Sequence, residues 1–390
     1  MFHLLLDADV FTPEAKGRCN VLVAGGTIAW IGEGVPQLGN ELQVSVHDLS
    51  GCRVVPGLID AHAHLTGGGG ENGFSSRVPP VSLNCFTAAG ITSVVGVLGT
   101  DDSTRNTASL LAETRGLCEE GISAWCHTGG YHLPPVTLTG SVRGDIVHVD
   151  RIIGIGEVAI SDHRSSQPSL SELLRIAADA HVAGLISAKA GIVHLHLGDG
   201  RRGLEMVQRA LDTSEIPARV FNPTHVNRRR ALFEEAVELA TRGCTVDITA
   251  FPELGSSDEI WAHEALLSYL DSGAPAGSVT VSSDGGGCLP VFDERGEMIS
   301  MNVGKPATLF HTLRRLLLDG HAPERILPAF TLNVANLLRL PHKGRLAPGA
   351  DADLVVLDAT CNIRSVMAAG RWHVRDGRQL IRRRIQEIAH

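Results

Sequence analysis

Residues 55–73 read VPGLIDAHAHLTGGGGENG, a stretch that combines an apolar run, two histidines and four consecutive glycines. The apolar residues Leu58 and Ile59 have the composition of a buried strand near its end. His62 and His64 come next, at positions i and i+2. In extended chain their side chains point to the same face, so both imidazoles can reach one ion. The pattern taken alone is also typical of two ordinary histidines, and the metal interpretation depends on residues further along the chain.

The composition is that of a large acidic chain with a sizeable apolar content. It has 390 residues, 43% of them hydrophobic, and a formal net charge of -9. The length suits one large domain with a smaller one, and the negative charge disfavours nucleic acid as a partner. The eight cysteines form no CxxC pair, which predicts reduced, mostly buried thiols. The start MFHLLLDADV lacks a basic signal region and no apolar run could span a bilayer, so a cytoplasmic protein without membrane contact is expected.

From Leu58 onward, short apolar runs alternate with amphipathic segments. Residues 233–240 carry apolar side chains at i, i+3, i+4 and i+7, and SLSE at 169–172 has the form of a helix capping box. Eight strand–helix units in about 260 residues predict an α/β fold, a (β/α)8 TIM-like barrel with its functional residues after the strands. The first strand is expected at Leu58, and the others at 93–97, 123–128, 152–160, 193–197, 219–222, 245–249 and 279–282.

The two ends of the chain have a different, strand-rich texture. VLVAGGTIAWIG at 21–32 carries a hairpin signal at its two glycines, and strand-like runs return after Leu340 in DLVVLDA and WHVRDG. These strands are expected to pair with one another. The prediction is therefore a small β-sandwich domain built from residues 1–56 and 341–390, with the barrel at 57–340.

Polar side chains follow six of the eight predicted strands. Four histidines and two carboxylates among them would meet at one barrel mouth, which core packing does not easily explain. Histidine nitrogen with carboxylate oxygen suits zinc, and the lack of cysteine ligands points to an open, catalytic site. The polar residues are His62, His64, Glu71, Tyr131, Glu157, Arg164, His194, His196, His225, Arg228 and Asp284.

Several of these stretches together resemble the metal-dependent amidohydrolase superfamily and, within it, the isoaspartyl (β-aspartyl) dipeptidase family. They are GLIDAHAHLTGGGGE, GITSVVGVLGTD, GISAWCHTGGYH, TGSV, AISDHRS, HLGD, PTHVNR, SSDGGG and PGADADLVVL, which spread over essentially the whole chain. The resemblance implies a barrel with a β-sandwich, two zinc ions and hydrolysis of β-aspartyl dipeptides by a hydroxide that the metals activate. It also implies a homo-oligomer, with an octamer as one candidate.

The resemblance also implies a role for each matching residue. His62 and His64 match the ligands of the first metal, and His196 and His225 those of the second. Asp284 matches a metal-bound aspartate that takes a proton from the attacking water. The substrate contacts it implies are Tyr131 on the scissile carbonyl, Glu71 on the free α-amino group, Arg164 and Arg228 on substrate carboxylates, and Thr100 as a hydroxyl contact.

Three positions depart from the family pattern or need separate interpretation. Glu157 stands where the family bridges its metals with a carboxylated lysine, and Lys189 is too far to substitute, roughly 20 Å from His196 along an extended strand. A pair of metals bridged by Glu157 is favoured over a single metal. Cys288 stands where a substrate-binding serine is expected, and a thiol is a weak donor. His194 is expected to be a packing residue, not a ligand.

Two other functions compete with the dipeptidase. One is another amidohydrolase, such as an N-acyl amino acid deacylase or a cyclic amidase. A neutral cyclic amide would not require the charges of Glu71 and the two arginines. The other is a non-catalytic scaffold on the same fold, which would have no use for four convergent histidines.

Overall fold

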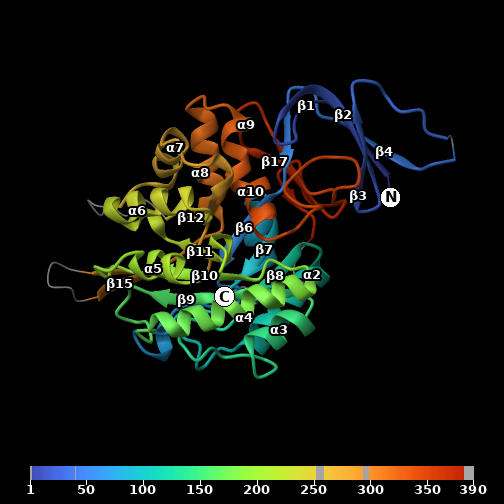
Figure 1. Ribbon diagram of the computed structural model, residues 1–390. Helices are drawn as coiled ribbons and strands as arrows, with labels where there is room; N and C mark the ends of the chain where they lie inside the picture. The colour runs from blue at the N-terminus through green and yellow to red at the C-terminus, as the bar shows by residue number, and fades with distance from the viewer. Residues whose placement is uncertain (1, 40, 252–258, 293–297, 382–390) are drawn as a thin grey trace.

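The computed structural model describes residues 2–39, 41–251, 259–292 and 298–381. Eight parallel strands follow one another along the chain, and a helix connects each to the next (Figure 1). The strands are β6 (Leu58–Ala63), β7 (Ile91–Gly96), β8 (Ser123–Thr128), β9 (Ile152–Ile160), β10 (Ile192–Leu197), β11 (Phe221–Thr224), β12 (Val246–Thr249) and β13 (Val279–Ser282). The helices are α1 (Leu83–Ala88), α2 (Thr107–Glu120), α3 (Val142–His148), α4 (Leu170–Ser187), α5 (Glu205–Thr213), α6 (Arg230–Thr241), α7 (Ala262–Asp271) and, after β13, α8 (Ala307–Leu318).

The order of the strands is that of a TIM-like α/β fold. Strands β6 to β11 form one six-stranded parallel sheet, and β12 pairs with β13. β12 also lies against β11, and β13 lies against β6. A single parallel bridge joins Ala63 to Gly285, just beyond β13. The ends of the first and last strands therefore meet, which brings residues more than 200 positions apart to one mouth.

Local sequence explains the helices that surround these strands. Ser169 caps α4, accepting a hydrogen bond from the Glu172 backbone, while the Glu172 carboxylate accepts one from the Ser169 backbone at 2.8 Å. This is the predicted capping box. In α6 the residues Phe233, Ala236 and Ala240 are buried, as the 3.6-residue period predicts. Such faces, with the apolar strand residues, make up the large core between strands and helices.

The sixth strand lies two residues later than the sequence predicted. Residues Ala218–Val220 form a 3-10 turn after Pro217, and β11 runs on to Thr224. His225 then comes directly after the strand, with φ 62. A proline lacks a backbone N–H and commonly marks the end of a strand, but Pro223 takes a position inside the ladder and pairs with Leu195.

Strands from both chain ends join in a single nine-stranded sheet. Its members are β1 (Phe2–Phe11), β2 (Ala15–Ala24), β3 (Thr27–Gly32), β4 (Val44–Asp48), β5 (Arg53–Pro56), β16 (Leu354–Leu357), β17 (Ile363–Ala368), β18 (Arg371–Arg375) and β19 (Arg378–Gln379). The two ends meet where β5 pairs antiparallel with β16. Because the hydrogen bonds run through one sheet, a sandwich of two separate sheets is not confirmed. The sheet has its own apolar cluster, which includes Leu5, Val21 and Leu354.

A hairpin and two short helices also come after the eighth strand. A hairpin of β14 (Cys288–Phe292) and β15 (Met298–Val303) leaves the mouth, and the short helices α9 (Pro323–Ile326) and α10 (Leu332–Leu337) lead back to the nine-stranded sheet. The hairpin was not predicted. Within the described residues, no helix has the length and apolarity needed to cross a membrane.

Candidate active site

His62 and His64 lie at the end of β6, where the sequence placed them. His62 is the last histidine inside the strand and is fully buried, and His64 is the first residue after it. Their rings lie 5.3 Å apart between centroids. The backbone N–H of His64 donates to the carbonyl of Gly285 at 2.8 Å, so the chain after β6 is fixed against the chain after β13.

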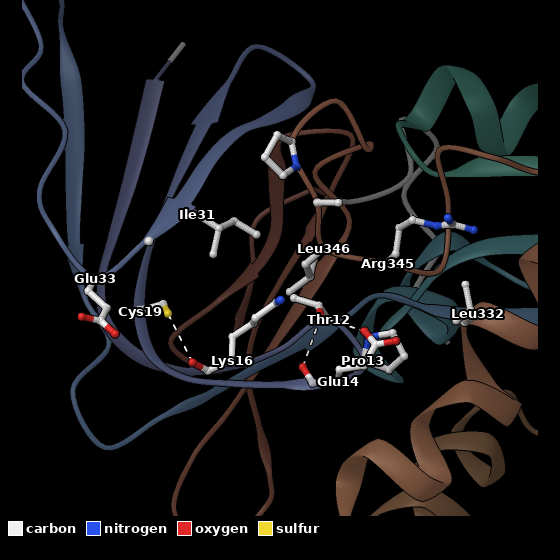
Figure 2. A pocket seen from close by; sticks show the side chains of 13 residues that line it. Thr12, Pro13, Glu14, Lys16, Cys19, Ile31, Glu33, Leu332, Arg345 and Leu346 are labelled. Carbon is white, nitrogen blue, oxygen red and sulfur yellow. Dashed lines mark hydrogen bonds between the residues drawn. The ribbon is translucent and has the colours of Figure 1, made fainter.

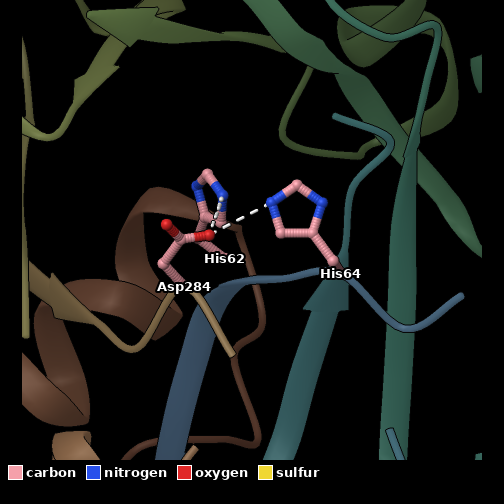
Figure 3. A group of neighbouring side chains, drawn as sticks. All are labelled: His62, His64 and Asp284. Atoms are coloured by element: carbon pink, nitrogen blue, oxygen red, sulfur yellow. Dashed lines mark ion pairs between the residues drawn. The ribbon is translucent and has the colours of Figure 1, made fainter. Parts of the chain in front are cut away.

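Asp284 lies just after β13, the last strand of the barrel, and its carboxylate contacts both histidines. Its Oδ1 lies 3.1 Å from Nε2 of His64 and 3.4 Å from Nε2 of His62, as Figure 3 shows. The residue adopts φ 52, a left-handed conformation that aspartate tolerates better than most residues. This backbone turn directs the carboxylate into the mouth.

Glu157, on β9, places one carboxylate oxygen toward each pair of histidines. Oε2 lies 3.4 Å from Nε2 of His62 and 3.6 Å from Nε2 of His64. Oε1 lies 2.5 Å from Nδ1 of His196 and 3.1 Å from Nε2 of His225. The first pair comes from the end of β6, and the second from the ends of β10 and β11. A carboxylate arranged in this way can contact two ions at once.

The donor set of the mouth fits a metal ion. Among the described residues, nothing hydrogen-bonds to His62 Nε2, Glu157 Oε2 or Asp284 Oδ1, although all three atoms are buried. Buried polar atoms are normally paired, so their convergence indicates a missing positive partner. Two groups have their candidate ligand atoms within 4.8 Å of one another: His62, His64 and Asp284, and His62, Glu157 and His225. His196 stands outside both groups and reaches them through Glu157.

The electrostatics of the mouth favour a bound cation. Burial alone would raise the pKa of Glu157, but His62 and His196 outweigh it and hold the pKa well below its ordinary value. Burial likewise opposes the low pKa of Asp284, which the neighbouring His62 and His64 produce. Both carboxylates are therefore ionised at neutral pH. Burial lowers the pKa of His225 well below its usual value. Burial also opposes protonation of His62, but Glu157 and Asp284 outweigh it and raise the pKa of His62 well above its usual value, so this ring attracts the same carboxylates that a cation would.

A second cluster of polar side chains lies beside the metal-binding groups. The hydroxyl of Thr100 donates to Glu71 Oε1 at 2.9 Å, and the thiol of Cys288 donates to Glu71 Oε2 at 2.8 Å. Nη1 of Arg164 lies 3.0 Å from Glu71 Oε1. Burial opposes ionisation of Glu71, but these contacts outweigh it and lower its pKa. The cluster therefore presents one negative and one positive group side by side.

Asp162 is a site residue that the sequence reasoning missed. Its Oδ2 lies 3.0 Å from Nε2 of His196 and accepts from Nη2 of Arg164 at 2.7 Å, while Oδ1 accepts from Nε of Arg164 at 3.1 Å. One carboxylate thus fixes a metal-site histidine and an arginine. The signal was present, because Asp162 stands two residues before Arg164 in the stretch SDHR.

Tyr131 lies at the junction of the two clusters. Its hydroxyl is 2.8 Å from Nδ1 of His196, and the guanidinium of Arg164 lies 5.6 Å from its ring centroid. Burial raises the pKa of Tyr131 well above its ordinary value, so the phenol keeps its proton. It can donate a hydrogen bond to a group bound at the mouth.

Arg228 lies apart from the Arg164 cluster. It belongs to the 3-10 turn Val226–Arg228 after β11, and its guanidinium lies 5.2 Å from the ring centroid of Phe251. Phe251 in turn stacks on His225, with centroids 5.7 Å apart. Nε of Arg228 has no hydrogen-bond partner within the described part of the chain. The two arginines thus have different neighbours: Arg164 lies beside His196, and Phe251 lies between Arg228 and His225.

Neither Lys189 nor His194 belongs to the groups that could bind metal, but His194 contacts one of their members. Nζ of Lys189 donates to the carbonyls of Ile146 and Val149, at 2.6 and 2.5 Å, which keeps it away from the mouth. His194 belongs to neither group, and its Nε2 lies 2.8 Å from Nδ1 of His62. Burial lowers the pKa of His194 to about 4, so it is neutral at neutral pH.

Comparisons with known proteins agree with this architecture. In overall structure the chain is similar to a beta-aspartyl dipeptidase from Fervidobacterium islandicum AW-1, solved in complex with beta-Asp-Leu dipeptide, at 40% identity and a TM-score of 0.91, with 99% of each chain covered. A dihydropyrimidinase from Brevibacillus agri NCHU1002, at 17% identity, TM-score 0.70 and coverage of 97% and 96%, shares the fold. In sequence the chain is 24% identical to an imidazolonepropionase from Paracoccus denitrificans, over 87% of each. The model of the amidohydrolase family matches residues 53–373, so the chain belongs to that family, as the sequence motifs predicted.

Proposed function

We propose that this amidohydrolase is a zinc-dependent dipeptidase that hydrolyses β-aspartyl dipeptides. The observation that carries the proposal is the pairing of Glu71 and Arg164, 3.0 Å apart, beside the histidine and carboxylate cluster. A β-aspartyl residue carries its free ammonium and its α-carboxylate on the same carbon. Adjacent groups of opposite charge suit that substrate, and the 40% identity to a chain crystallised with beta-Asp-Leu supports the same choice.

Six side chains would hold two zinc ions. His62, His64 and Asp284 would bind one ion and His196 and His225 the other, with the two oxygens of Glu157 bridging them. The buried atoms without hydrogen bonds on His62, Glu157 and Asp284 support the first ion, and the contacts of Glu157 Oε1 with His196 and His225 support the second. Zinc bound there would supply Lewis acidity and bring the pKa of water down toward ~7.

The substrate contacts follow from the charges in the second cluster. Glu71 would take the ammonium, assisted by Thr100 and by Cys288. A β-aspartyl dipeptide has two carboxylates, and Arg164 and Arg228 would bind one each. Asp162 accepts from Nε and Nη2 of Arg164, which leaves Nη1, now in contact with Glu71, facing the place where a substrate carboxylate would bind.

The chain's own residues would move the proton of the reaction. Asp284 would accept the proton of the water whose oxygen bonds to the amide carbon. It would return that proton to the amine nitrogen as the C–N bond breaks, which an amide leaving group requires. The hydroxyl of Tyr131 would donate to the carbonyl oxygen and stabilise the negative charge that develops on it.

The competing cyclic amidase fits the second cluster less well. A neutral ring would bring no charged group to Glu71 or Arg164, so this ion pair would make no charge-assisted contact with the substrate. An N-acyl amino acid would use an arginine but would bring no ammonium to Glu71. Both alternatives predict substrates that can be assayed beside the dipeptide.

Purified protein should be assayed for hydrolysis of β-Asp-Leu with metal quantification in the same sample. The expected result is turnover of β-Asp-Leu, loss of activity on its N-acetylated form, and about two zinc ions per chain. Hydrolysis of a hydantoin or of an N-acyl amino acid in preference to β-Asp-Leu would reject the proposal.

His62→Ala and His225→Ala should lower the bound zinc, and Glu157→Ala should leave fewer than two ions. Retention of both ions in Glu157→Ala would reject the bridge.

We also propose the domain boundaries, the cellular location and the oligomeric state of this protein. The nine-stranded sheet would be the small sandwich-like domain, with boundaries at residues 1–56 and 341–390, and the barrel domain would span 57–340. Residues 382–390 lie outside the described part. The eight unpaired cysteines support a reducing, cytoplasmic location. The predicted homo-oligomer is to be tested by light scattering of the purified chain.

A further inference from the structure

A line of hydrogen bonds extends behind His62, on the side away from Asp284 and Glu157. Nδ1 of His62 lies 2.8 Å from Nε2 of His194, and Nδ1 of His194 lies 2.7 Å from Oδ1 of Asn222. Nδ2 of Asn222 donates to the carbonyl oxygen of Thr245 at 2.8 Å. His62, His194 and Asn222 are each at most 1% exposed, so solvent does not compete for these bonds.

The last bond in the line sets the direction of the bond before it. The carbonyl of Thr245 can only accept, so the Asn222 atom that faces it must be the amide nitrogen. Oδ1 of Asn222 therefore faces His194 and must accept from Nδ1–H. Nε2 of His194 faces Nδ1 of His62, so one of the two atoms must donate. A His62 that binds metal through Nε2 carries its hydrogen on Nδ1, and Nε2 of His194 then accepts that hydrogen. What His62 presents to the mouth is Nε2.

We propose that Asn222 and His194 are positioning residues that hold the proton of His62 on Nδ1, so that the Nε2 lone pair is directed at the metal. The proposal rests on the metal site of the proposed function and assigns to His194 more than packing. His62 is common to both groups of candidate ligands. An error in its tautomer would therefore weaken the whole centre. Loss of such an outer partner typically lowers metal affinity about 10–100-fold.

His127 offers a matched control for His194. The two rings stack at 5.6 Å between centroids with an interplanar angle of 20°, and both are buried. Among the described residues, no side chain hydrogen-bonds to the His127 ring. His127→Phe and His194→Phe thus make the same change in neighbouring positions, but only His194→Phe removes the acceptor of His62. His194→Gln is the conservative variant, because its amide can still accept from His62 and donate to Asn222.

The test has two readouts. Metal-free, isotope-labelled wild-type protein is studied by long-range 1H–15N NMR, with the His194 signals assigned by their loss in His194→Gln. We expect hydrogen on Nδ1 and none on Nε2. Zinc affinity is then measured against a competing chelator. His194→Phe should bind about 10–100-fold more weakly than wild type, whereas His127→Phe and His194→Gln should stay within about threefold of it.

Two results would overturn the proposal. One is a hydrogen on Nε2 of His194 in the wild type. The other is zinc affinity in His194→Phe equal to that in His127→Phe. If His194→Phe does not fold, the wild-type tautomer and the His194→Gln affinity still decide the question. A wrong assignment of the metal site gives a different result. If His62 is not a zinc ligand, His62→Ala keeps the zinc content of the wild type, and the position of the hydrogen on His194 does not change.

Discussion

The barrel mouth and the pocket on the nine-stranded sheet are both lined by charged side chains, but only the mouth has buried polar groups without partners. The pocket has a volume of about 550 Å³ and lies between the start of β2, β3 and residues 345–348 (Figure 2). Its Glu14, Lys16 and Glu33 are exposed to solvent. None of its described lining residues has a buried side-chain nitrogen or oxygen without a partner, whereas His62, Glu157 and Asp284 each have one. Unpaired buried groups thus separate the mouth from this pocket, although buried atoms without partners also occur elsewhere, at His127 and in the sheet at Trp372 and His373.

The largest difference between the mouth and the sheet pocket is expected when one carboxylate in each is replaced by its amide. Asp284→Asn should lower kcat on β-Asp-Leu by about 10²–10⁴-fold, because the proton acceptor is lost. Glu33→Gln, on the rim of the sheet pocket, should change kcat less than about twofold, since surface changes away from a site have small effects. Zinc content is measured in both variants. Near-normal turnover by Asp284→Asn would contradict the assigned mechanism.

The two tyrosines of the chain give the next contrast. Tyr131→Phe should lower kcat by about 10²–10³-fold, the usual cost of removing one donor to a developing oxyanion. Tyr269, on α7, donates its hydroxyl to the carbonyl of Pro275 at 3.0 Å. Tyr269→Phe should cost about 1 kcal/mol of unfolding free energy and leave kcat unchanged. Similar kcat losses in the two variants would show that the Tyr131 hydroxyl has no special role.

A smaller effect is expected from the arginine beside Phe251. Arg228→Ala should raise KM for a dipeptide with both carboxylates about 10–100-fold, because a hydrogen bond to a charged group contributes about 1.5–3 kcal/mol. A dipeptide amidated at its C-terminal carboxylate should lose much less. KM is to be measured for both substrates with the same enzyme. Equal losses on the two would mean that Arg228 stabilises the protein and does not read the carboxylate.

Periodicity and turn signals were sufficient to predict most of the fold. Strands predicted at 123–128, 152–160 and 279–282 have those bounds, and the capping box at Ser169 is present. The strands of the two chain ends pair with one another, as predicted, where β5 meets β16, but the predicted sandwich is not confirmed. One continuous nine-stranded sheet and a sandwich of two sheets use strands with the same alternation, so local pattern does not separate them.

In the site, too, residues marked by their position after a strand were predicted, and residues marked only by a distant partner were not. The histidines were found because each follows a strand, and strand ends meet at one face. Asp162 and Asn222 were missed because their roles depend on partners 34 and 28 residues away, His196 and His194. A sequence shows which side chains can ligate a metal. It does not show which of their two nitrogens another residue occupies.

The smallest effect on activity is expected from His373, a buried residue of β18 that belongs to the sheet region. Its Nε2 lies 3.2 Å from the carbonyl of Gly121 and donates to it. Burial lowers its pKa from 6.5 to about 4, although that hydrogen bond opposes the shift. Between these values the unfolded chain binds a proton that the folded chain excludes. The stability that His373 contributes is therefore present above pH 6.5 and is lost as the pH falls toward 4, by at most about 3 kcal/mol.

His373→Gln keeps a donor for Gly121 and removes this titration. Urea unfolding of both proteins between pH 4 and 7 should show a steeper loss of stability on acidification for the wild type. The kcat at pH 7 should agree within about twofold, because the sheet region stabilises the chain without taking part in the reaction. Equal slopes would mean that other groups, such as His47 with its pKa lowered to about 4 by burial, dominate the acid response. A fall in kcat comparable to that of Tyr131→Phe would break the distinction between the two regions, since it would connect the sheet to the chemistry of the mouth.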